Sequence, residues 1–580
     1  MKAIKLFLSA VIIFTAGALQ ASEPIVEISY IPPVGKDGIA EGRVVWNELT
    51  AENAEDYAVI ALLKSTWGDT YAKPDYNNYL NDIDEYGNFF INITTGASDA
   101  EQPDCYFYLV LRSMFAGVDG STVKAHNMGG RNLVQIEISR ATFWANRLQA
   151  PIPNIQPGFV PAETEILLSA SDEGTVKYTL DGSSPAESST AQTYEGNAFT
   201  VPDDTPLLIK AVLMNDDKCS ETVNLTYLPY TLNSTFFGLN VSLVLNNETF
   251  GSHLSEETAR ERLEHIIGLT DWIRTFGTTN NGLEYINKIA KESGRKSMIG
   301  LYITNDIAAN DAQLAGLTAI LQTNPAPDLI AVGNEPSQIG LKPAVLAAYI
   351  DSARRIVQEH NLVIPIGSVD TGNASWTQLV QKKLDFKGVN LYPGVWDTVS
   401  ESQMFPQLKQ QWQQAADNNP NLMLILTEIG SSYYTGTYSL PGGGTQTASE
   451  QKAAKYLENV LDWMSTDSIP AFYFEAYDEN KSGHAIEKHF GIFDENGEMH
   501  PLYRNFLTTS IGDVKLHADS PYPNPSSNTV FFPEESDAKL LNLQGMLLKQ
   551  TVGRHIDISA YPSGVYMLRL NGNIHRIVKK

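Results

Sequence analysis

Two glutamates stand at the ends of apolar runs, 93 residues apart in the chain. Glu335 ends the string Leu-Ile-Ala-Val-Gly-Asn-Glu of residues 329–335, and Glu428 ends Leu-Ile-Leu-Thr-Glu of residues 424–428. Such runs are typical of buried strands, so each carboxylate is expected where a strand stops. Two carboxyl groups suffice to break a glycosidic bond, because one protonates the leaving oxygen and the other meets the cationic sugar centre. We therefore take Glu335 and Glu428 as a candidate catalytic pair.

The interval between the two glutamates predicts a (β/α)8 barrel. About 250 residues shared among eight units give about 31 residues per unit, so 93 residues make three steps, from the fourth strand to the seventh. Catalytic groups of such barrels come from the carboxyl ends of the strands, which places both carboxylates on one rim. An open doubly wound sheet is the alternative, but the glycine fingerprint of dinucleotide-binding sheets is absent. The eight expected strands are 236–241, 272–276, 298–302, 329–332, 365–368, 388–391, 424–427 and 471–474.

Length, composition and charge limit the classes of protein to which this chain can belong. A chain of 580 residues is too long for one hydrophobic core, so about three to five domains are expected. Hydrophobic residues make up 43% of the chain and aromatic residues 10%, which excludes a disordered protein. The net charge of −26 argues against nucleic acid or an anionic membrane as a partner, because phosphates require Lys and Arg clusters. A neutral substrate fits this charge better.

The first residues have the pattern of an export signal. Lys2 and Lys5 precede an apolar centre at 6–14, and small residues at 16–21 follow it. The apolar centre is too short to span a bilayer stably, although a retained anchor is the alternative. We expect a signal peptide at 1–21 and no stable membrane span.

Changes in pattern divide the rest of the chain into four parts. Residues 22–142 hold short alternating runs broken by turns, which predict a β-sandwich, and residues 155–230 predict a second all-β sandwich. In residues 231–512 strands alternate with helices, as a parallel barrel requires. Residues 514–580 return to short strands and turns. The expected fold is multidomain, with two all-β sandwich modules ahead of a (β/α)8 TIM-barrel catalytic domain and a small β sorting domain behind it.

The last part carries strings that resemble a known sorting signal. Tyr-Pro-Asn-Pro at 522–525, Leu-Leu-Asn-Leu-Gln-Gly at 540–545 and Pro-Ser-Gly-Val-Tyr-Met at 562–567 resemble the C-terminal sorting domain of type IX secretion cargo. The resemblance implies the type IX secretion machinery as a partner. It also implies that the protein is secreted or displayed on the outer cell surface.

The two expected sandwiches also resemble known modules. Residues 30–33 and 42–44 together with Trp67 make the first similar to an accessory domain of bacterial β-glucan-degrading enzymes. Trp67 and Tyr71 offer rings that stack on sugars, with packing in the core as the alternative. The string at 178–185 of the second resembles the small chitobiase C-terminal-like β-sandwich, which implies a spacer more than a sugar-binding module.

Local chemistry gives the two glutamates different roles. Asn334 precedes Glu335 and is suited to hydrogen-bond the sugar 2-OH, an interaction that strengthens in the transition state. We therefore expect Glu335 to be the acid/base and Glu428 the nucleophile of a retaining mechanism. Partial burial and the charge of its partner should raise the pKa of the acid. Arg274, at an expected strand end, is assigned to the site, with simple pairing to a neighbouring acid as the alternative.

The barrel resembles glycoside hydrolase family 17, which comprises β-1,3-glucanases and related glucanosyltransferases. The matching strings are Val-Gly-Asn-Glu at 332–335, Val-Asn-Leu-Tyr-Pro at 389–393, Thr-Glu-Ile-Gly-Ser-Ser at 427–432 and Phe-Glu-Ala-Tyr-Asp-Glu-Asn-Lys at 474–481. The resemblance implies that Tyr392 lines the sugar site and that Glu479, Lys481 and Glu487 surround the catalytic pair.

Two departures from the family distinguish this chain. Ile-Gly-Ser-Ser at 429–432 lacks the Trp of plant-type members, and Phe276 stands where the family often has Tyr. The string at 474–479 is closer to microbial members, so an endo-acting laminarinase of plant type is not assumed.

The resemblance implies a secreted retaining hydrolase that cleaves β-1,3-glucan, endo or exo, through a covalent glycosyl-enzyme intermediate. A β-1,3-glucanosyltransferase is the near alternative, because a sugar hydroxyl can intercept the same intermediate. A cell-surface glucan-binding protein without activity is the alternative from another class, and retention of both Glu335 and Glu428 argues against it. The 10 His residues show no metal-binding spacing, so neither a metal nor a cofactor is expected.

Overall fold

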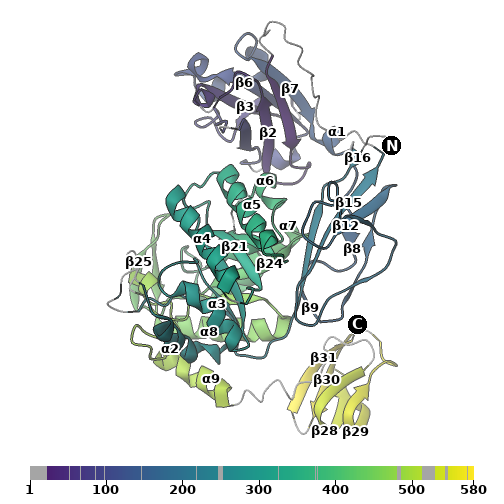
Figure 1. Cartoon of the computed structure of the whole chain (residues 1–580), viewed down its shortest axis with the longest axis vertical. Helices are drawn as coiled ribbons and strands as arrows, with labels where there is room; N and C mark the ends of the chain where they lie inside the picture. The colour runs from purple at the N-terminus through teal and green to yellow at the C-terminus, as the bar shows by residue number, and fades with distance from the viewer. Residues whose placement is uncertain are drawn as a thin grey trace.

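The computed structural model shows two β-rich units, a barrel and a small C-terminal β unit (Figure 1). It describes residues 23–579 except 51, 66, 85, 97, 146, 217, 246–247, 249–252, 324, 373, 375, 480–484, 513–528, 543–546, 563 and 571–572. The expected signal peptide at 1–21, Lys481, the tail string at 522–525 and parts of the other two tail strings lie outside the described residues. The multidomain fold predicted from the sequence is confirmed.

The first β-rich unit is a sandwich of two antiparallel sheets, drawn at the top of Figure 1. One sheet has the strand order β1-β2-β5 and the other β4-β3-β6-β7. Alternate residues of β3 and β6, such as Leu63 and Phe107, pack between the sheets, because successive side chains of a strand point to opposite faces. The elements are β1 (Ile25–Tyr30), β2 (Ile39–Val45), β3 (Tyr57–Lys64), β4 (Thr70–Lys73), β5 (Asn88–Asn92), β6 (Asp104–Leu111), β7 (Val134–Ser139) and the short helix α1 (Arg140–Ala145).

The second β-rich unit is built around two long strands, β15 and β17. Its largest sheet has the order β13-β12-β15-β17-β9, with β16 paired to β15, and β9 runs parallel to β17. Two short pairs, β10-β14 and β11-β8, complete it. The strands are β8 (Ile152–Pro153), β9 (Gly158–Val160), β10 (Glu165–Ile166), β11 (Leu168–Ser169), β12 (Thr175–Thr179), β13 (Gln192–Thr193), β14 (Phe199–Thr200), β15 (Leu207–Asn215), β16 (Lys218–Cys219) and β17 (Val223–Pro229).

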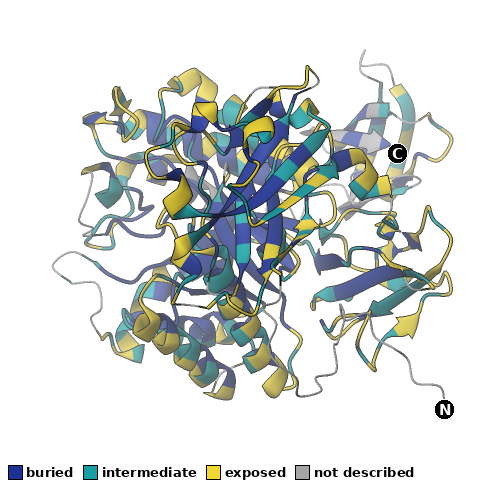
Figure 2. Cartoon of the chain, turned by 90° about the horizontal axis from the view of Figure 1, so that it is seen from above, coloured by how far each residue is buried: buried dark blue, intermediate teal, exposed yellow. Residues whose placement is uncertain are grey.

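Eight parallel strands close into the predicted barrel. Each strand pairs with the next along the chain and the last with the first. The strands are buried almost throughout, since helices cover their outer side and side chains fill the interior (Figure 2). The strands, all of which overlap the expected ones, are β18 (Phe236–Asn240), β19 (Thr270–Arg274), β20 (Lys296–Leu301), β21 (Leu329–Asn334), β22 (Ile366–Thr371), β23 (Phe386–Asn390), β24 (Met423–Ile429) and β27 (Ala471–Tyr473).

Amphipathic helices surround the barrel. In α5, Leu346, Ile350, Ala353 and Val357 are buried on one stripe behind an N-terminal Pro343. Among the described residues, no helix combines the length and the apolar character needed to cross a membrane. The helices are α2 (Glu256–Ile267), α3 (Leu283–Glu292), α4 (Ile307–Thr323), α5 (Pro343–Glu359), α6 (Gln378–Gln381), α7 (Glu401–Asn418), α8 (Glu450–Asp467) and α9 (Pro501–Gly512), and a hairpin of β25 (Gly436–Ser439) and β26 (Thr445–Ala448) follows β24.

The C-terminal unit is one antiparallel sheet of four strands, β29-β28-β30-β31, drawn in yellow in Figure 1. Apolar residues of all four strands, with Leu540, Ile556, Leu568 and Ile577 among them, form its core. The strands are β28 (Thr529–Leu541), β29 (Leu547–Asp557), β30 (Gly564–Leu570) and β31 (Asn573–Lys579).

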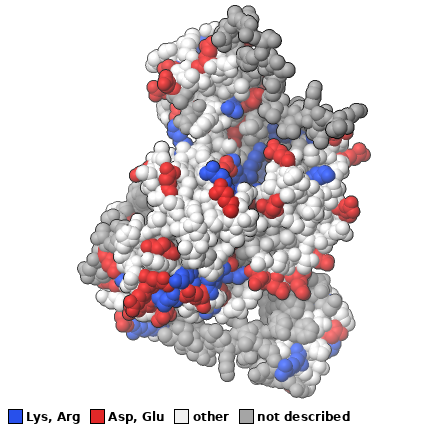
Figure 3. All heavy atoms as spheres, in the orientation of Figure 1, with Lys and Arg blue, Asp and Glu red and all other residues white. Residues whose placement is uncertain are grey.

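The short helix α6 joins the barrel to both β-rich units. The Glu41 carboxylate of β2 accepts hydrogen bonds from the backbone nitrogens of residues 378–379 at the start of α6. Burial raises the pKa of Glu41 to about 7. Asn224 of β17 donates to the carbonyls of Lys382 (3.0 Å) and Leu384 (2.8 Å), just beyond α6. Figure 3 shows basic and acidic side chains close together on the barrel below the first unit.

Candidate active site

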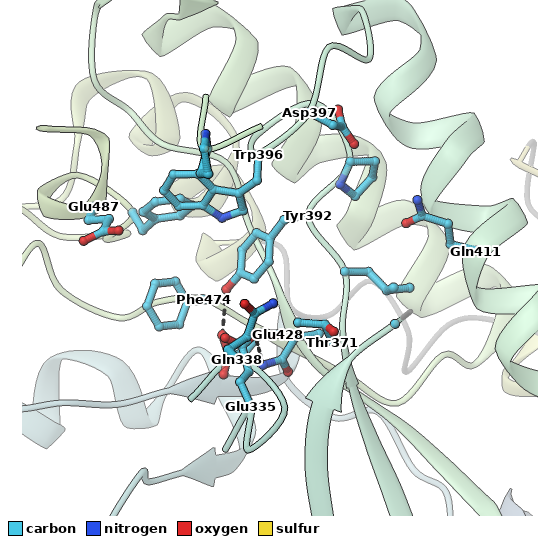
Figure 4. Close-up of a pocket in the computed structure, with 16 residues that line it drawn as sticks. Glu335, Gln338, Thr371, Tyr392, Trp396, Asp397, Gln411, Glu428, Phe474 and Glu487 are labelled. Carbon is cyan, nitrogen blue, oxygen red and sulfur yellow. Dashed lines mark hydrogen bonds between the residues drawn. The ribbon is translucent and has the colours of Figure 1, made fainter. Parts of the chain in front are cut away.

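Glu335 and Glu428 line one cavity of about 690 Å³ at the carboxyl ends of the barrel strands (Figure 4). Glu335 directly follows β21, and Glu428 is the last residue but one of β24. These strands are the fourth and the seventh around the barrel, as the spacing predicted. Because the carboxyl ends of all barrel strands meet on one face, two glutamates far apart in sequence reach the same cavity.

The backbone turns sharply where β21 delivers Glu335. Glu335 has a φ of 50° and Gly333 a φ of 82°, and both values lie in the left-handed region. A residue other than glycine held there costs about 1–3 kcal/mol and requires support from its surroundings. The Glu335 backbone nitrogen donates to the carbonyl of Val369 on β22 at 2.9 Å, which supplies part of that support. The neighbouring strand therefore helps to fix the direction of the Glu335 side chain.

The carboxyl group of Glu335 titrates near neutral pH. Burial, followed by the negative charge of Glu428, raises the pKa of Glu335 to about 7. Asn390 at the end of β23 opposes this rise, because its Nδ2 donates to Oε1 of Glu335 at 2.9 Å and stabilises the charged form. A group with such a pKa is protonated in a large fraction of molecules at neutral pH and can release that proton readily.

Both carboxylate oxygens of Glu428 accept a hydrogen bond. Arg274 Nη1 lies 3.0 Å from Oε1, and Tyr392 Oη donates to Oε2 at 2.9 Å. Figure 4 shows the Tyr392 ring above the carboxylate with its hydroxyl pointing down to it. Burial, then the charges of Glu428 and Glu335, raise the pKa of Tyr392 well above its usual value. The Tyr392 hydroxyl therefore keeps its proton and remains a donor.

Arg274, the last residue of β19, pairs with the Glu428 carboxylate and also links the end of its own strand to the ends of β18 and β21. Its Nη1 donates to Asn240 Oδ1 at 2.7 Å, and its Nη2 donates to Asn334 Oδ1 at 2.7 Å. The guanidinium also lies over the ring of Phe276, 4.7 Å from its centre. Arg274 is 1% exposed. The predicted residues Arg274, Asn334 and Glu428 thus form one network, in which Arg274 and Glu428 are buried and Asn334 is partly exposed.

Aromatic and polar side chains line the rest of this cavity. Trp396, Asp397 and Gln411 lie on one side, and Phe474 and Glu487 on another (Figure 4). Glu487, which the family resemblance implicated, therefore faces the same cavity as the glutamate pair. Asp397 holds the loop after β23, since its Oδ1 accepts from the backbone nitrogens at 394 (2.8 Å) and 399 (2.9 Å).

A second cavity of about 460 Å³ adjoins the first at Phe474, which lines both. Glu479 belongs to this second cavity, together with Phe276 and the ring of Tyr302, which is 46% exposed. Glu479 therefore lines a different cavity from the glutamate pair, and Phe474 borders both cavities. Lys481, the remaining residue implied by the resemblance, lies outside the described residues.

Sequence reasoning did not single out Asn240 and Asn390 as site residues. Asn240 is the last residue of β18 and Asn390 the last of β23. Asn390 accepts a hydrogen bond from Thr427 Oγ1 at 2.8 Å while donating to Glu335. Each is followed by one more apolar residue, Val241 or Leu391, which the expected strands 236–241 and 388–391 included. The signal that identified Glu335, a polar residue where an apolar run stops, therefore did not point to them.

No group of three or more His, Cys, Asp or Glu side chains in the described part of the chain is arranged to hold a metal ion. Carboxylates of the site are instead satisfied by Arg274, Tyr392 and Asn390. The expectation that the site needs neither metal nor cofactor stays a prediction.

Three family models match parts of the chain. Residues 238–491 match the BtgE/BtgC glycoside hydrolase domain, residues 166–227 match the model described as Fn3 associated, and residues 520–580 match the secretion system C-terminal sorting domain. The match over the second β-rich unit does not show the chitobiase likeness, which stays a prediction. The sorting domain agrees with the predicted type IX tail and indicates export to the cell surface or secretion.

Curated relatives match part of the chain at low identity. A probable β-glucosidase btgE of Aspergillus fumigatus is 25% identical over 227 residues, which are 38% of this chain and 39% of the relative. A putative glucan endo-1,3-beta-glucosidase btgC of Aspergillus niger is 22% identical over 283 residues, or 43% of this chain and 40% of the relative. The chain thus spans about two fifths of the length of these relatives.

A solved structure has a similar region. The glycoside hydrolase family 17 β-1,3-glucanosyltransferase of Rhizomucor miehei is 23% identical, with a TM-score of 0.40 over 46% of this chain and 96% of that one. The family models place the similarity in the closed barrel, in the second β-rich unit and in the tail. Residues 238–491 are therefore similar to the BtgE/BtgC glycoside hydrolase domain, and residues 520–580 are similar to a secretion-system sorting domain.

Proposed function

We propose that this chain is a secreted retaining glycoside hydrolase that cleaves β-1,3-glucan through a covalent glycosyl-enzyme intermediate. The observation that carries the proposal is the contrast between two glutamates in one cavity. Glu335 has a pKa raised to about 7, whereas Glu428 pairs with Arg274 at 3.0 Å. Separating the environments of two carboxyl groups is how one site obtains both a proton donor and an anionic nucleophile.

In the first step Glu335 gives its proton to the glycosidic oxygen, and the bond between that oxygen and the anomeric carbon breaks. The Glu428 carboxylate attacks the anomeric carbon and forms a glycosyl ester. Arg274 and Tyr392 hold the two Glu428 oxygens, so the carboxylate is oriented before the sugar arrives. Arg274 also holds Asn334 by Oδ1, which directs the amide nitrogen of Asn334 toward a sugar hydroxyl, by our proposal the 2-OH.

In the second step the Glu335 carboxylate takes a proton from water, and the water oxygen attacks the anomeric carbon. The bond to Glu428 breaks, the carboxylate is regenerated and the Glu335 proton is restored. Two displacements at one carbon return the original anomeric configuration. A sugar hydroxyl in place of water gives the glucanosyltransferase, so the ratio of water to acceptor attack decides between the two activities.

The surrounding residues are proposed to bind further sugar units. Trp396 and Phe474 offer rings on which glucose faces stack, and Glu487 offers a carboxylate for sugar hydroxyls. Glu479 serves the sugar that occupies the second cavity. Lys481, two residues further along the sequence, is proposed to act with Glu479.

The choice of β-1,3-glucan has two supports. The strings at 389–393 and 427–432 resemble glycoside hydrolase family 17, and a relative at 22% identity carries the name putative glucan endo-1,3-beta-glucosidase. We propose that residues 231–512 form the catalytic domain, that 22–142 and 155–230 form the modules ahead of it, and that 514–580 address the protein to type IX export.

The product profile tests the proposal. The mature protein is incubated with linear and branched β-1,3-glucan, and products are followed by chromatography and by proton NMR of the anomers. We expect shorter oligosaccharides released first as β-anomers, with Glu428→Gln inactive and Glu359→Gln, an exposed carboxylate on α5, fully active. Products longer than the substrate indicate the transferase. If the protein binds glucan without cleaving it, and Glu428→Gln leaves the affinity unchanged, the proposal that the chain is an enzyme is overturned.

A further inference from the structure

A third cavity, of about 380 Å³, lies on the first β-rich unit, on the sheet β4-β3-β6-β7 at the top of Figure 1. Strands β3, β6 and β7 each supply side chains to it from one face of this sheet. The turn between β3 and β4 and the segment before β7 close its sides. The lining includes Lys64, Asp69, Tyr106, Tyr108, Lys124 and Glu137.

The alternation of the strands shows that this cavity is on the outer face of the sheet. Leu63 and Phe107 pack inward between the two sheets, so their neighbours Lys64, Tyr106 and Tyr108 point outward. The loop from 112 to 128 covers only part of that outer face, where it packs on residues such as Ile60 and Val110. The cavity lies beside this packing, between Tyr106 and Tyr108 of β6 and the loop residues 124–126.

Tyr108 gives this cavity an unused polar atom. The residue is 0% exposed, yet its Oη has no hydrogen-bond partner among the described residues. A buried hydroxyl without a partner costs about 1–3 kcal/mol, which a ligand acceptor at this position would recover. Burial raises the pKa of Tyr108 to about 12, so the group is a neutral hydroxyl.

Aromatic surface accompanies this hydroxyl. The rings of Tyr106 and Tyr108 lie 6.3 Å apart and 25° from parallel, and Tyr106 is only partly buried. Trp67 precedes the lining residues Gly68 and Asp69 and is 93% exposed. An indole left in water at the edge of a cavity is typical of a ligand-binding surface, because it gains most from being covered.

The charges of the lining fit a neutral ligand. Two cationic side chains, Lys64 and Lys124, face two anionic ones, Asp69 and Glu137. Lys64 Nζ lies 3.3 Å from Glu137 Oε1, and Lys124 Nζ donates to the carbonyl oxygen of Thr70 at 2.7 Å. Both ammonium groups thus have partners, which disfavours a phosphate and leaves hydroxyls, carboxylates and amides that bind sugar hydroxyls.

We propose that this cavity is a second, non-catalytic binding site for a segment of β-1,3-glucan. The glucan identity rests on the proposed function of the barrel, whereas the neutral glycan class rests on the cavity itself. Two sites on one chain bind a long polymer more tightly than either site alone, since the second contact is intramolecular. The sandwich would hold the polymer while the barrel cuts it.

The test is binding of the full mature chain to insoluble linear β-1,3-glucan, measured by depletion from solution. All proteins carry Glu428→Gln, so the polymer is not consumed, and the barrel contributes equally to each. Tyr108→Phe removes only the unused oxygen, and Trp67→Ala removes a ring that is 93% exposed. Tyr86→Ala removes another exposed ring of the same unit, 62% exposed and outside the cavity.

We expect Tyr108→Phe and Trp67→Ala each to weaken binding about tenfold and Tyr86→Ala to leave it unchanged. The melting temperature of Tyr108→Phe should equal or exceed that of its parent, because the Tyr108 hydroxyl has no hydrogen-bond partner in the part of the chain that the structure describes. Equal affinity in all four proteins overturns the proposal, as does a fall in the Tyr108→Phe melting temperature. Preference for another neutral polysaccharide overturns the assignment to β-1,3-glucan.

Hydrolysis of soluble β-1,3-oligosaccharides by the wild-type chain is measured alongside. This readout reports on the barrel alone. If Tyr108→Phe and Trp67→Ala weaken glucan binding but the wild-type chain hydrolyses nothing, the proposed function is rejected and the second site stands. If the wild-type chain hydrolyses the oligosaccharides but neither variant alters glucan binding, the second site is rejected and the proposed function stands.

Discussion

Arg274 and Glu428 form an ion pair in which Nη1 and Oε1 are 3.0 Å apart and the side chains are 1% and 7% exposed. Salt screens such a buried pair weakly, and water competes little for its hydrogen bond. The same guanidinium holds Asn334 and Asn240. One cation thus sets the positions of side chains from β18, β21 and β24.

Replacing Arg274 by Met leaves the Glu428 charge buried without its partner. Removing one member of a buried pair costs about 3–5 kcal/mol, so we expect a lower free energy of unfolding in urea and a kcat reduced at least about 100-fold. Arg274→Lys keeps the charge but loses the fork that reaches both asparagines, and should recover stability more than kcat. Arg355→Met, on the exposed face of α5, is the control. If Arg274→Met keeps both the stability and the kcat of the wild type, the proposed role of this network is wrong.

Tyr392→Phe removes a single donor from Glu428 Oε2. A hydrogen bond to a charged group contributes about 1.5–3 kcal/mol, so we expect kcat/KM to fall about 10- to 100-fold with the fold unchanged. Steady-state kinetics on a β-1,3-oligosaccharide measure this. Tyr349→Phe on α5 should match the wild type, and an equally active Tyr392→Phe would show that the contact has no part in the reaction.

The rate should depend on the protonation of Glu335. Because the acid must be protonated, kcat/KM is expected to fall as pH rises through about 7. The hydrogen bond from Asn390 stabilises the charged form of Glu335. Asn390→Ala should therefore raise the pKa of Glu335 and move the alkaline limb of the pH profile, where kcat/KM falls, to higher pH. A limb that moves to lower pH, or that stays in place, contradicts the assignment of Glu335 as the acid.

The titration of Glu335 should also make the free energy of unfolding depend on pH. The folded pKa of Glu335 lies above its unfolded value of 4.5, so its favourable contribution is full below pH 4.5 and is lost as pH rises through about 7. Glu335→Gln has no charge to bury. We expect the barrel of this variant to be more stable than wild type at about pH 9, by up to about 3 kcal/mol, and nearly equal at about pH 4. Thermal unfolding at both pH values measures this difference, and a variant less stable at the higher pH contradicts it.

The barrel and the place of its glutamates were predictable from local signals. Each strand is an apolar run bounded by polar residues, and the spacing between Glu335 and Glu428 fixed their strands as the fourth and the seventh. The alternating runs of the first part and the strings of the tail likewise predicted their β units. The strands depend on residues close together in sequence, and the regular length of the barrel's units links the two distant glutamates, which is why pattern and period suffice for them.

Contacts between distant strand ends were not predictable in the same way. Asn240 meets Arg274 34 residues later and both meet the segment of Glu428 more than 150 residues later, and no periodicity encodes such a meeting. The two cavities on either side of Phe474 also depend on how loops pack. The junction at α6, where Glu41 caps a helix of the barrel, required the relative placement of whole units.

The central claim, that Glu428 is the nucleophile of a retaining reaction, is tested most directly by trapping the intermediate. A 2-deoxy-2-fluoro glucosyl donor with a good leaving group slows the second step more than the first, and peptide mass spectrometry then locates the sugar. The account predicts one sugar per chain on Glu428, none in Glu428→Gln, and normal labelling in Glu359→Gln. A label on Glu335, or rapid turnover of natural glucan with products of inverted configuration, would contradict it.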